Sequence, residues 1–125
     1  MAEDPIPDIR SFGSGNRAAE EDRLEGIEVL GDWSGAQAAG PALDRPVESA
    51  EGWAEVWAAV GRAAPVPWPE AARARAFVAE QQSTGGFRVL AAAEAAGVAL
   101  RLAPPAPGRP VTMALTRPWR VVLYR

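Results

Sequence analysis

Residues 87–102 read Phe-Arg-Val-Leu-Ala-Ala-Ala-Glu-Ala-Ala-Gly-Val-Ala-Leu-Arg-Leu, and this stretch decides the expected fold. Its first part alternates apolar side chains with others from Phe87 to Ala91, and its last part does the same from Val98 to Leu102. Residues 94–97 make a reversal between the two parts. Period-two alternation is typical of strands with one buried face. The stretch therefore predicts an antiparallel strand pair, although the alanines beyond Ala91 are also compatible with a helix.

Similar short runs lie on both sides of this stretch. Further strands are expected over residues 24–33, 36–39, 43–47, 74–80, 111–116 and 119–123. The first of these should end near Asp32, where turn-forming residues begin. Pro46 cannot donate a hydrogen bond to a neighbouring strand, which places its segment at the edge of a sheet.

Residues 49–61 form the one clear helix of the sequence. Its apolar stripe, at helical spacing, consists of Trp53, Val56, Trp57 and Val60. Ser49 is placed to cap the start of the helix, and Gly61 is placed to end it. A helix packed on a sheet explains this stripe better than an aromatic platform for a ligand.

Two proline-bearing segments flank the regular structure. Residues 64–69 form a connector that favours polyproline II, and Pro5 and Pro7 break any regular element in residues 1–22. We expect residues 1–22 to be a flexible acidic tail and residues 23–125 to be one globular domain. The expected fold class is α+β: a mainly antiparallel sheet or sandwich of about five to seven strands, with the helix packed on it.

Charge is divided unevenly along the 125-residue chain. Residues 1–55 hold thirteen acidic residues against four arginines, a net −9, whereas residues 56–125 hold three against nine, a net +6. The arginines are scattered singly, without interleaved aromatic residues, so nucleic-acid binding is not expected. Attraction between the two halves explains the division better. No run of about 18 apolar residues is present, so no membrane span is expected.

The chain lacks the residues that most enzymes use for catalysis. It has no histidine, no cysteine and no lysine, which removes the usual general base near neutral pH, thiol nucleophiles and the common zinc ligands. Glu51 and Glu55 lie one turn apart on the expected helix, but nothing in the sequence desolvates them. We therefore expect a protein that is not an enzyme and that holds no metal or cofactor.

The first five residues, Met1-Ala2-Glu3-Asp4-Pro5, read as a start methionine placed before a mature exported N-terminus. Small residues flank the cleavage sites of signal peptides, and an acidic, proline-bearing stretch commonly follows them. We expect a periplasmic or secreted protein whose signal peptide has been removed.

Two aromatic-bearing loops are the candidate binding site. They are Ser83-Thr84-Gly85-Gly86-Phe87 and Arg117-Pro118-Trp119. The two glycines allow positive φ and a close approach to a partner, and the proline stiffens the second loop so that less entropy is lost on binding. Tryptophan and arginine dominate the energetics of many interfaces. Alternatively, Phe87 and Trp119 fill the core and Arg117 is solvated.

Several of these motifs, taken in order, resemble a PrcB-type domain, the C-terminal domain of a bacterial protease-complex subunit. The similarity covers about residues 47–124 and rests on the tryptophan-rich helix, the Thr84-Gly85-Gly86-Phe87 turn, the Pro104-Pro105 loop and the closing Thr116-Arg117-Pro118-Trp119. The aspartate-phenylalanine pair that the family places before its central strand is absent. The resemblance implies an exported domain that associates with a protease and affects its stability or activity, without catalysis.

Both loops are also similar, more loosely, to those of chagasin-type inhibitors of cysteine peptidases. In that family a threonine-glycine-aromatic loop and an arginine-proline-aromatic loop lie side by side and enter the enzyme's cleft. The present chain has no convincing counterpart of that family's middle glycine-rich loop. The likeness implies only a geometry, in which the two loops lie together.

The resulting expectation is an exported protein-binding module. Phe87 and Trp119 would insert into a protein partner, such as a protease, and Arg117 would add polar contacts. Two alternatives stay open. One is a structural or assembly domain of the cell envelope, in which the loops only pack. The other is a carbohydrate-binding module, in which exposed tryptophans stack on sugar rings.

Overall fold

The computed structural model describes residues 21–125, so most of the predicted tail (residues 1–22) lies outside the described residues. The described part contains one helix and six strands, in the order β1 (Val29–Gly35), β2 (Leu43–Val47), α1 (Ala50–Val60), β3 (Arg73–Val78), β4 (Arg88–Glu94), β5 (Gly97–Ala103) and β6 (Trp119–Tyr124). All strand pairs between these elements are antiparallel. The predicted α+β class, with a mainly antiparallel sheet and one packed helix, is confirmed.

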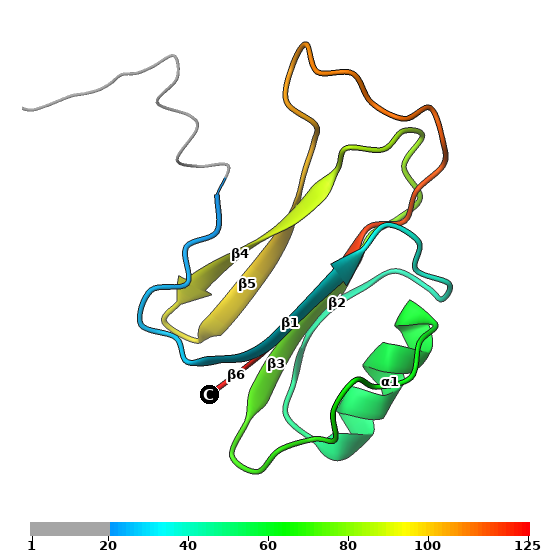
Figure 1. Ribbon diagram of the computed structural model, residues 1–125. Helices are drawn as coiled ribbons and strands as arrows, with labels where there is room; N and C mark the ends of the chain where they lie inside the picture. Colours follow the sequence, from blue (N-terminus) through cyan, green and yellow to red (C-terminus); the bar gives the residue numbers. More distant parts are fainter. Residues whose placement is uncertain (1–20) are drawn as a thin grey trace, which may run out of the picture.

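The elements stack in three layers (Figure 1). The middle layer is a four-stranded sheet in the order β1-β6-β3-β2, and the β4–β5 hairpin forms a separate two-stranded sheet. Helix α1 packs on one face of the middle layer and the hairpin packs on the other. All six residues of β6 are buried. The side chains of β6 therefore alternate between two cores, one under the helix and one under the hairpin.

Helix α1 lies where its sequence predicts, and both predicted caps are in place. The Ser49 hydroxyl accepts a hydrogen bond from the Gly52 N–H at 3.0 Å. Gly61 ends the helix with a φ of +92°, and its N–H donates to the carbonyl of Trp57 at 2.9 Å. All four residues of the predicted apolar stripe are buried. The helix therefore forms from local signals and is held by its packing on the sheet.

All five tryptophans of the chain meet in the core under α1. Trp57 is central, with its ring centroid 5.6–5.7 Å from those of Trp33, Trp53 and Trp119, each in an edge-to-face arrangement. Trp68, from the proline-rich connector, packs on Trp53 at 5.4 Å. Such aromatic pairs contribute about 0.5–1.5 kcal/mol each beyond their buried area. Because alanine fills 27 of the 125 positions, these rings supply much of the bulk of this core.

The predicted strand over residues 111–116 does not form. Residues 112–115 are exposed, and only Thr116 pairs, as an isolated bridge to Gln82. The alternation predicted a strand, but β6 is already paired on both edges by β1 and β3, so no strand edge of the middle layer next to β6 was open to it. The four prolines between residues 104 and 110 also keep this segment in a loop.

Two further boundaries differ from the prediction. Residues 36–39 form no return strand, because the backbone of Ala38 and Ala39 donates instead to the carbonyls of Arg117 and Val60, at 3.0 and 3.1 Å. Strand β1 continues to Gly35 rather than ending near Asp32, because β6 pairs with it over that whole length. The alanine-rich residues 90–94 are strand rather than helix, since β5 offers them a complete partner.

Replacing Trp119 with alanine removes one ring of the tryptophan cluster and leaves a cavity under α1. Trp119 is 2% exposed, so we expect the free energy of unfolding to fall by about 3–5 kcal/mol. Urea denaturation followed by circular dichroism measures this change. The exposed Val66 provides the control, because Val66→Ala should change stability by less than about 0.5 kcal/mol. Equal stability of Trp119→Ala and wild type would contradict the buried position of the ring.

Candidate functional site

The first predicted loop lies beside residues 112–116, the segment that leads into the second predicted loop, beyond one end of the sheet (Figure 1). Gln82 and Thr116 exchange backbone hydrogen bonds of 2.7 and 2.9 Å, and the Gly85 N–H donates to the Thr112 carbonyl at 2.8 Å. The Thr116 hydroxyl donates to the Thr84 carbonyl, also at 2.8 Å. Four hydrogen bonds therefore join residues 80–87 to residues 104–118, and we call these two segments the loop pair.

The two glycines of the first loop make this contact possible. Gly86 has a φ of +86°, and a Cβ atom there would lie 2.9 Å from the Cβ of Pro105 and 3.0 Å from a methyl group of Val111. A Cβ on Gly85 would lie 3.2 Å from the Cβ of Thr112. The positive φ is as the sequence predicts. However, the surface that the glycines approach is the second loop of the same chain.

The residues predicted to form the tip of the second loop point into the protein. Trp119 is buried in the tryptophan cluster, and Pro118 is buried as well. The half-buried Arg117 donates to the carbonyl of Ala79, at 3.1 and 3.3 Å, and to the carbonyl of Gly40. The expectation that Trp119 inserts into a partner, assisted by Arg117, is therefore wrong. Both side chains hold the second loop to the sheet and to the segment before β2.

Other side chains of the loop pair do face solvent. Ser83 is exposed, and Thr84 and Phe87 are half-buried. Met113 is 82% exposed and Leu115 is 58% exposed, more than any other large apolar side chain of residues 21–125. The alternation of residues 111–116 predicts a strand, so the exposure of Met113 and Leu115 is not expected from the sequence.

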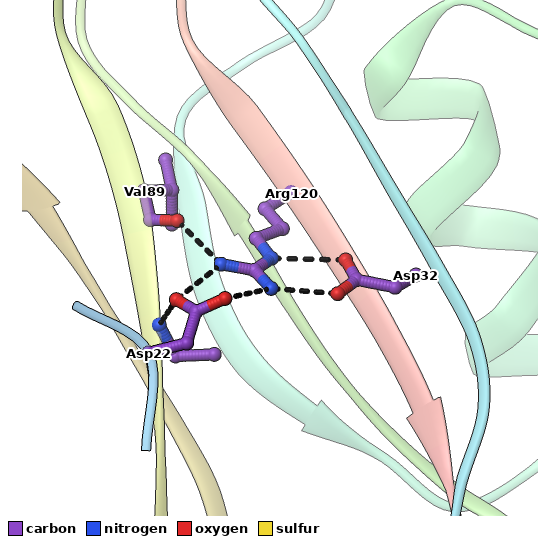
Figure 2. A network of polar contacts seen from close by, with 5 residues as sticks. Asp22, Asp32, Val89 and Arg120 are labelled. Atoms are coloured by element: carbon purple, nitrogen blue, oxygen red, sulfur yellow. Dashed lines mark hydrogen bonds and ion pairs between the residues drawn. The ribbon is translucent and has the colours of Figure 1, made fainter. Parts of the chain in front are cut away.

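A second polar site lies between the middle sheet and the hairpin, and Arg120 of β6 is its centre (Figure 2). The Nε and Nη2 groups of Arg120 donate to the Asp32 carboxylate at 2.9 and 2.6 Å. Nη1 and Nη2 donate to the two oxygens of Asp22 at 2.9 and 2.8 Å. Nη1 also donates to the Val89 carbonyl at 2.8 Å. These five bonds use the five N–H donors of a guanidinium group.

The network compensates a charge that is nearly removed from water. Arg120 is 8% exposed, and its burial alone would lower its pKa. Its hydrogen bonds to Asp22 and Asp32 outweigh burial and raise the pKa above the ordinary value, so the side chain stays charged. The same bond to Arg120 holds the pKa of the Asp22 carboxyl below its usual range, with help from the Ala91 N–H.

The network borders a groove of about 750 Å³ that lies between β1 and β4. Asp32 and Ser34 line it from β1, and Phe87 and Arg88 line it from the other side. Phe87 also belongs to the loop pair, so the groove and the loop pair adjoin. The groove thus offers charged and aromatic groups on a framework fixed by Arg120.

In residues 21–125 no cluster of three or more potential metal-ligating side chains is present. No helix of that part is long and apolar enough to cross a membrane. The carboxylates of Asp22 and Asp32 are both engaged by Arg120. What the sites supply is hydrogen bonds, charge and apolar surface.

Comparisons with models of known protein families, with curated proteins and with solved structures found no match. The resemblances to PrcB-type and chagasin-type proteins therefore stay hypotheses.

Sequence reasoning missed the Arg120 network, although one signal was present. Arg120 is the only charge in the run Trp-Arg-Val-Val-Leu-Tyr of residues 119–124. A strand that is apolar on both faces is a central strand, and a charge inside it needs a partner. No comparable signal selects Asp22, because Glu20, Glu21 and Asp22 are adjacent acidic residues.

Protonation of Asp22 breaks its ion pair, so its contribution to stability depends on pH. Its folded pKa lies below the ordinary value of 3.8. The contribution is therefore fully present well above the ordinary pKa, from about pH 5 upward, and is lost as the pH falls through the lower folded pKa. We expect the difference in free energy of unfolding between wild type and Asp22→Asn to shrink from about pH 5 to about pH 2. Urea denaturation at several pH values measures it, and a difference independent of pH would contradict the ion pair.

Proposed function

We propose that this protein is a non-catalytic protein-binding module and that the loop pair is its contact surface. The observation that carries the proposal is the exposure of Met113 and Leu115, at 82% and 58%. Both lie on a loop that four hydrogen bonds fix to its neighbour. Because the loop is already ordered, binding costs less conformational entropy than it would for a free segment. Burial of a large aliphatic side chain contributes about 1.5–3 kcal/mol.

The side chains of this surface fit an apolar depression on a protein partner. Methionine adapts its shape to irregular apolar surfaces, and the half-buried Phe87 extends the apolar area toward the groove. The resemblance to PrcB-type domains supports a protease as the partner and a periplasmic or secreted location. In this proposal Arg117 and Trp119 keep their predicted importance for binding indirectly, because they hold the second loop in place.

The arrangement of the tryptophans favours a protein partner over a carbohydrate. Three of the five rings are buried, and the other two, Trp33 and Trp68, pack against the same cluster. Stacking on a sugar requires an open aromatic face that this arrangement does not favour. A structural or assembly domain of the cell envelope would not require exposed apolar side chains on the loop pair.

The double substitution Met113→Glu/Leu115→Glu should abolish binding of the partner without changing the fold. Each residue that acts as a hot spot contributes about 2 kcal/mol or more, so affinity should fall by about thirtyfold or more for each of the two substitutions. The partner is captured from the exported fraction of the host with the wild-type protein and identified by mass spectrometry. Its dissociation constant is then measured for wild type and variant.

Val66→Glu is the matched control, because Val66 is an exposed aliphatic residue outside the loop pair. It introduces the same side chain and should leave the affinity unchanged. Unaltered binding by a folded Met113→Glu/Leu115→Glu protein would remove the loop pair as the contact surface.

A further inference from the structure

Residues 22–24 lie against the hairpin layer in the manner of a bound peptide. The Arg23 N–H donates to the Ala91 carbonyl at 2.8 Å, and the Ala93 N–H donates to the Arg23 carbonyl at 2.6 Å. Arg23 thereby forms a parallel bridge on the edge of β4 that β5 does not occupy. Addition of an extended segment to an open sheet edge is a common mode of peptide recognition.

Two side chains anchor this segment. The Asp22 carboxylate accepts hydrogen bonds from both terminal nitrogens of Arg120, at 2.9 and 2.8 Å, and from the Ala91 N–H at 3.0 Å (Figure 2). Leu24 packs, half-buried, against the core beneath the hairpin. Arg23 itself is exposed. The pattern is an acidic residue in a cationic site, an outward residue, and an aliphatic residue in an apolar site.

Arg120 also has partners outside this segment. Asp32 of β1 takes two hydrogen bonds from Arg120, and the Val89 carbonyl takes a third. These contacts neutralise and orient the guanidinium without any contribution from Asp22. The remaining N–H groups of Arg120 and that of Ala91 then converge on one carboxylate position, which is a built site for an acidic side chain.

The segment also takes no part in the strand pairings of the middle sheet. Its residues precede β1, which begins at Val29, and the turn between them contains Gly26 with a φ of +83°. Asp22, Arg23, Glu25 and Gly26 are all exposed. Detachment of residues 21–24 would leave the four strands of the middle sheet paired as they are.

We propose that the edge of β4, together with Arg120, is a docking site for an extended acidic peptide of another protein, and that residues 22–24 of this chain occupy it as an internal substitute. The peptide carries an aspartate that binds Arg120 and Ala91, and a large aliphatic residue two positions later. Its residues before the aspartate enter the adjoining groove, whose lining includes Phe87 and Arg88. The site uses neither Met113 nor Leu115, the two residues that carry the proposed function, and shares only the lining residue Phe87 with the loop pair.

A peptide competition experiment tests the proposal with the full-length chain. The probe is a synthetic peptide of residues 21–28, labelled with fluorescein at its C-terminal end, and its binding is followed by fluorescence anisotropy. The internal segment competes at a high effective concentration, so the wild-type protein should bind the probe weakly. Asp22→Asn/Leu24→Ala weakens the internal segment and should bind the probe at least about tenfold more tightly.

Two controls test whether binding of the probe requires its aspartate and whether the effect is specific to Asp22 and Leu24. A probe whose aspartate is replaced by asparagine should bind both proteins weakly, because it cannot pair with Arg120. Glu25→Gln, which removes a neighbouring exposed charge, should behave as wild type.

Several results would overturn the proposal. These are equal affinity of wild type and Asp22→Asn/Leu24→Ala for the probe, equal binding of the asparagine probe, and loss of fold in the double variant, which would make the segment an integral part of the domain. Circular dichroism checks the fold. A dimer of the wild-type chain in analytical ultracentrifugation, dissociated by Asp22→Asn/Leu24→Ala, would assign the edge to a second copy of the chain instead.

Discussion

The buried guanidinium of Arg120 constrains how the layers of this protein are assembled. An uncompensated charge at 8% exposure would cost several kcal/mol, so the carboxylate of Asp32 and the carbonyl of Val89 must be present where the sheet meets the hairpin. Each of these partners comes from a different strand. The requirement therefore fixes the position of the hairpin on the sheet more specifically than apolar packing alone, since alanine-rich surfaces offer few distinctive shapes.

The uneven distribution of charge along the sequence corresponds to ion pairs between its two halves. Among the ion pairs of residues 21–125, those of Arg75 with Asp44, of Arg120 with Asp22 and Asp32, and of Arg125 with Glu28 each join the acidic first half to the basic second half. The pairs of Arg75 and Arg125 are exposed and contribute little on their own, whereas those of Arg120 involve a buried arginine. Their common direction nevertheless shows that attraction between the halves, expected from the sequence, is realised in the fold.

The sequence predicted those parts of the structure that local chemistry determines. The helix followed from Ser49, Gly61 and one apolar stripe, and the hairpin followed from alternation around a reversal. Residues 111–116 alternate equally well, yet form no strand, because strand formation depends on an open neighbouring edge, which no local pattern reports. Trp119 and Met113 show that a local sequence pattern likewise does not report which side chains of the candidate site are buried. Whether an aromatic or aliphatic residue is buried depends on whether another layer packs against it. Helix α1 covers Trp119, whereas no element of residues 21–125 packs against Met113.

The gathering of every tryptophan under α1 divides the molecule optically. Intrinsic emission excited in the indole band arises from the helix side of the sheet alone, because β4 and β5 contain no tryptophan. The hairpin side holds instead the ring of Tyr124, whose hydroxyl accepts from the Val98 N–H at 3.2 Å. Separation of the hairpin from the sheet would therefore leave tryptophan emission unchanged and would alter tyrosine emission. Tryptophan and tyrosine fluorescence thus report separately on the core under α1 and the core under the hairpin.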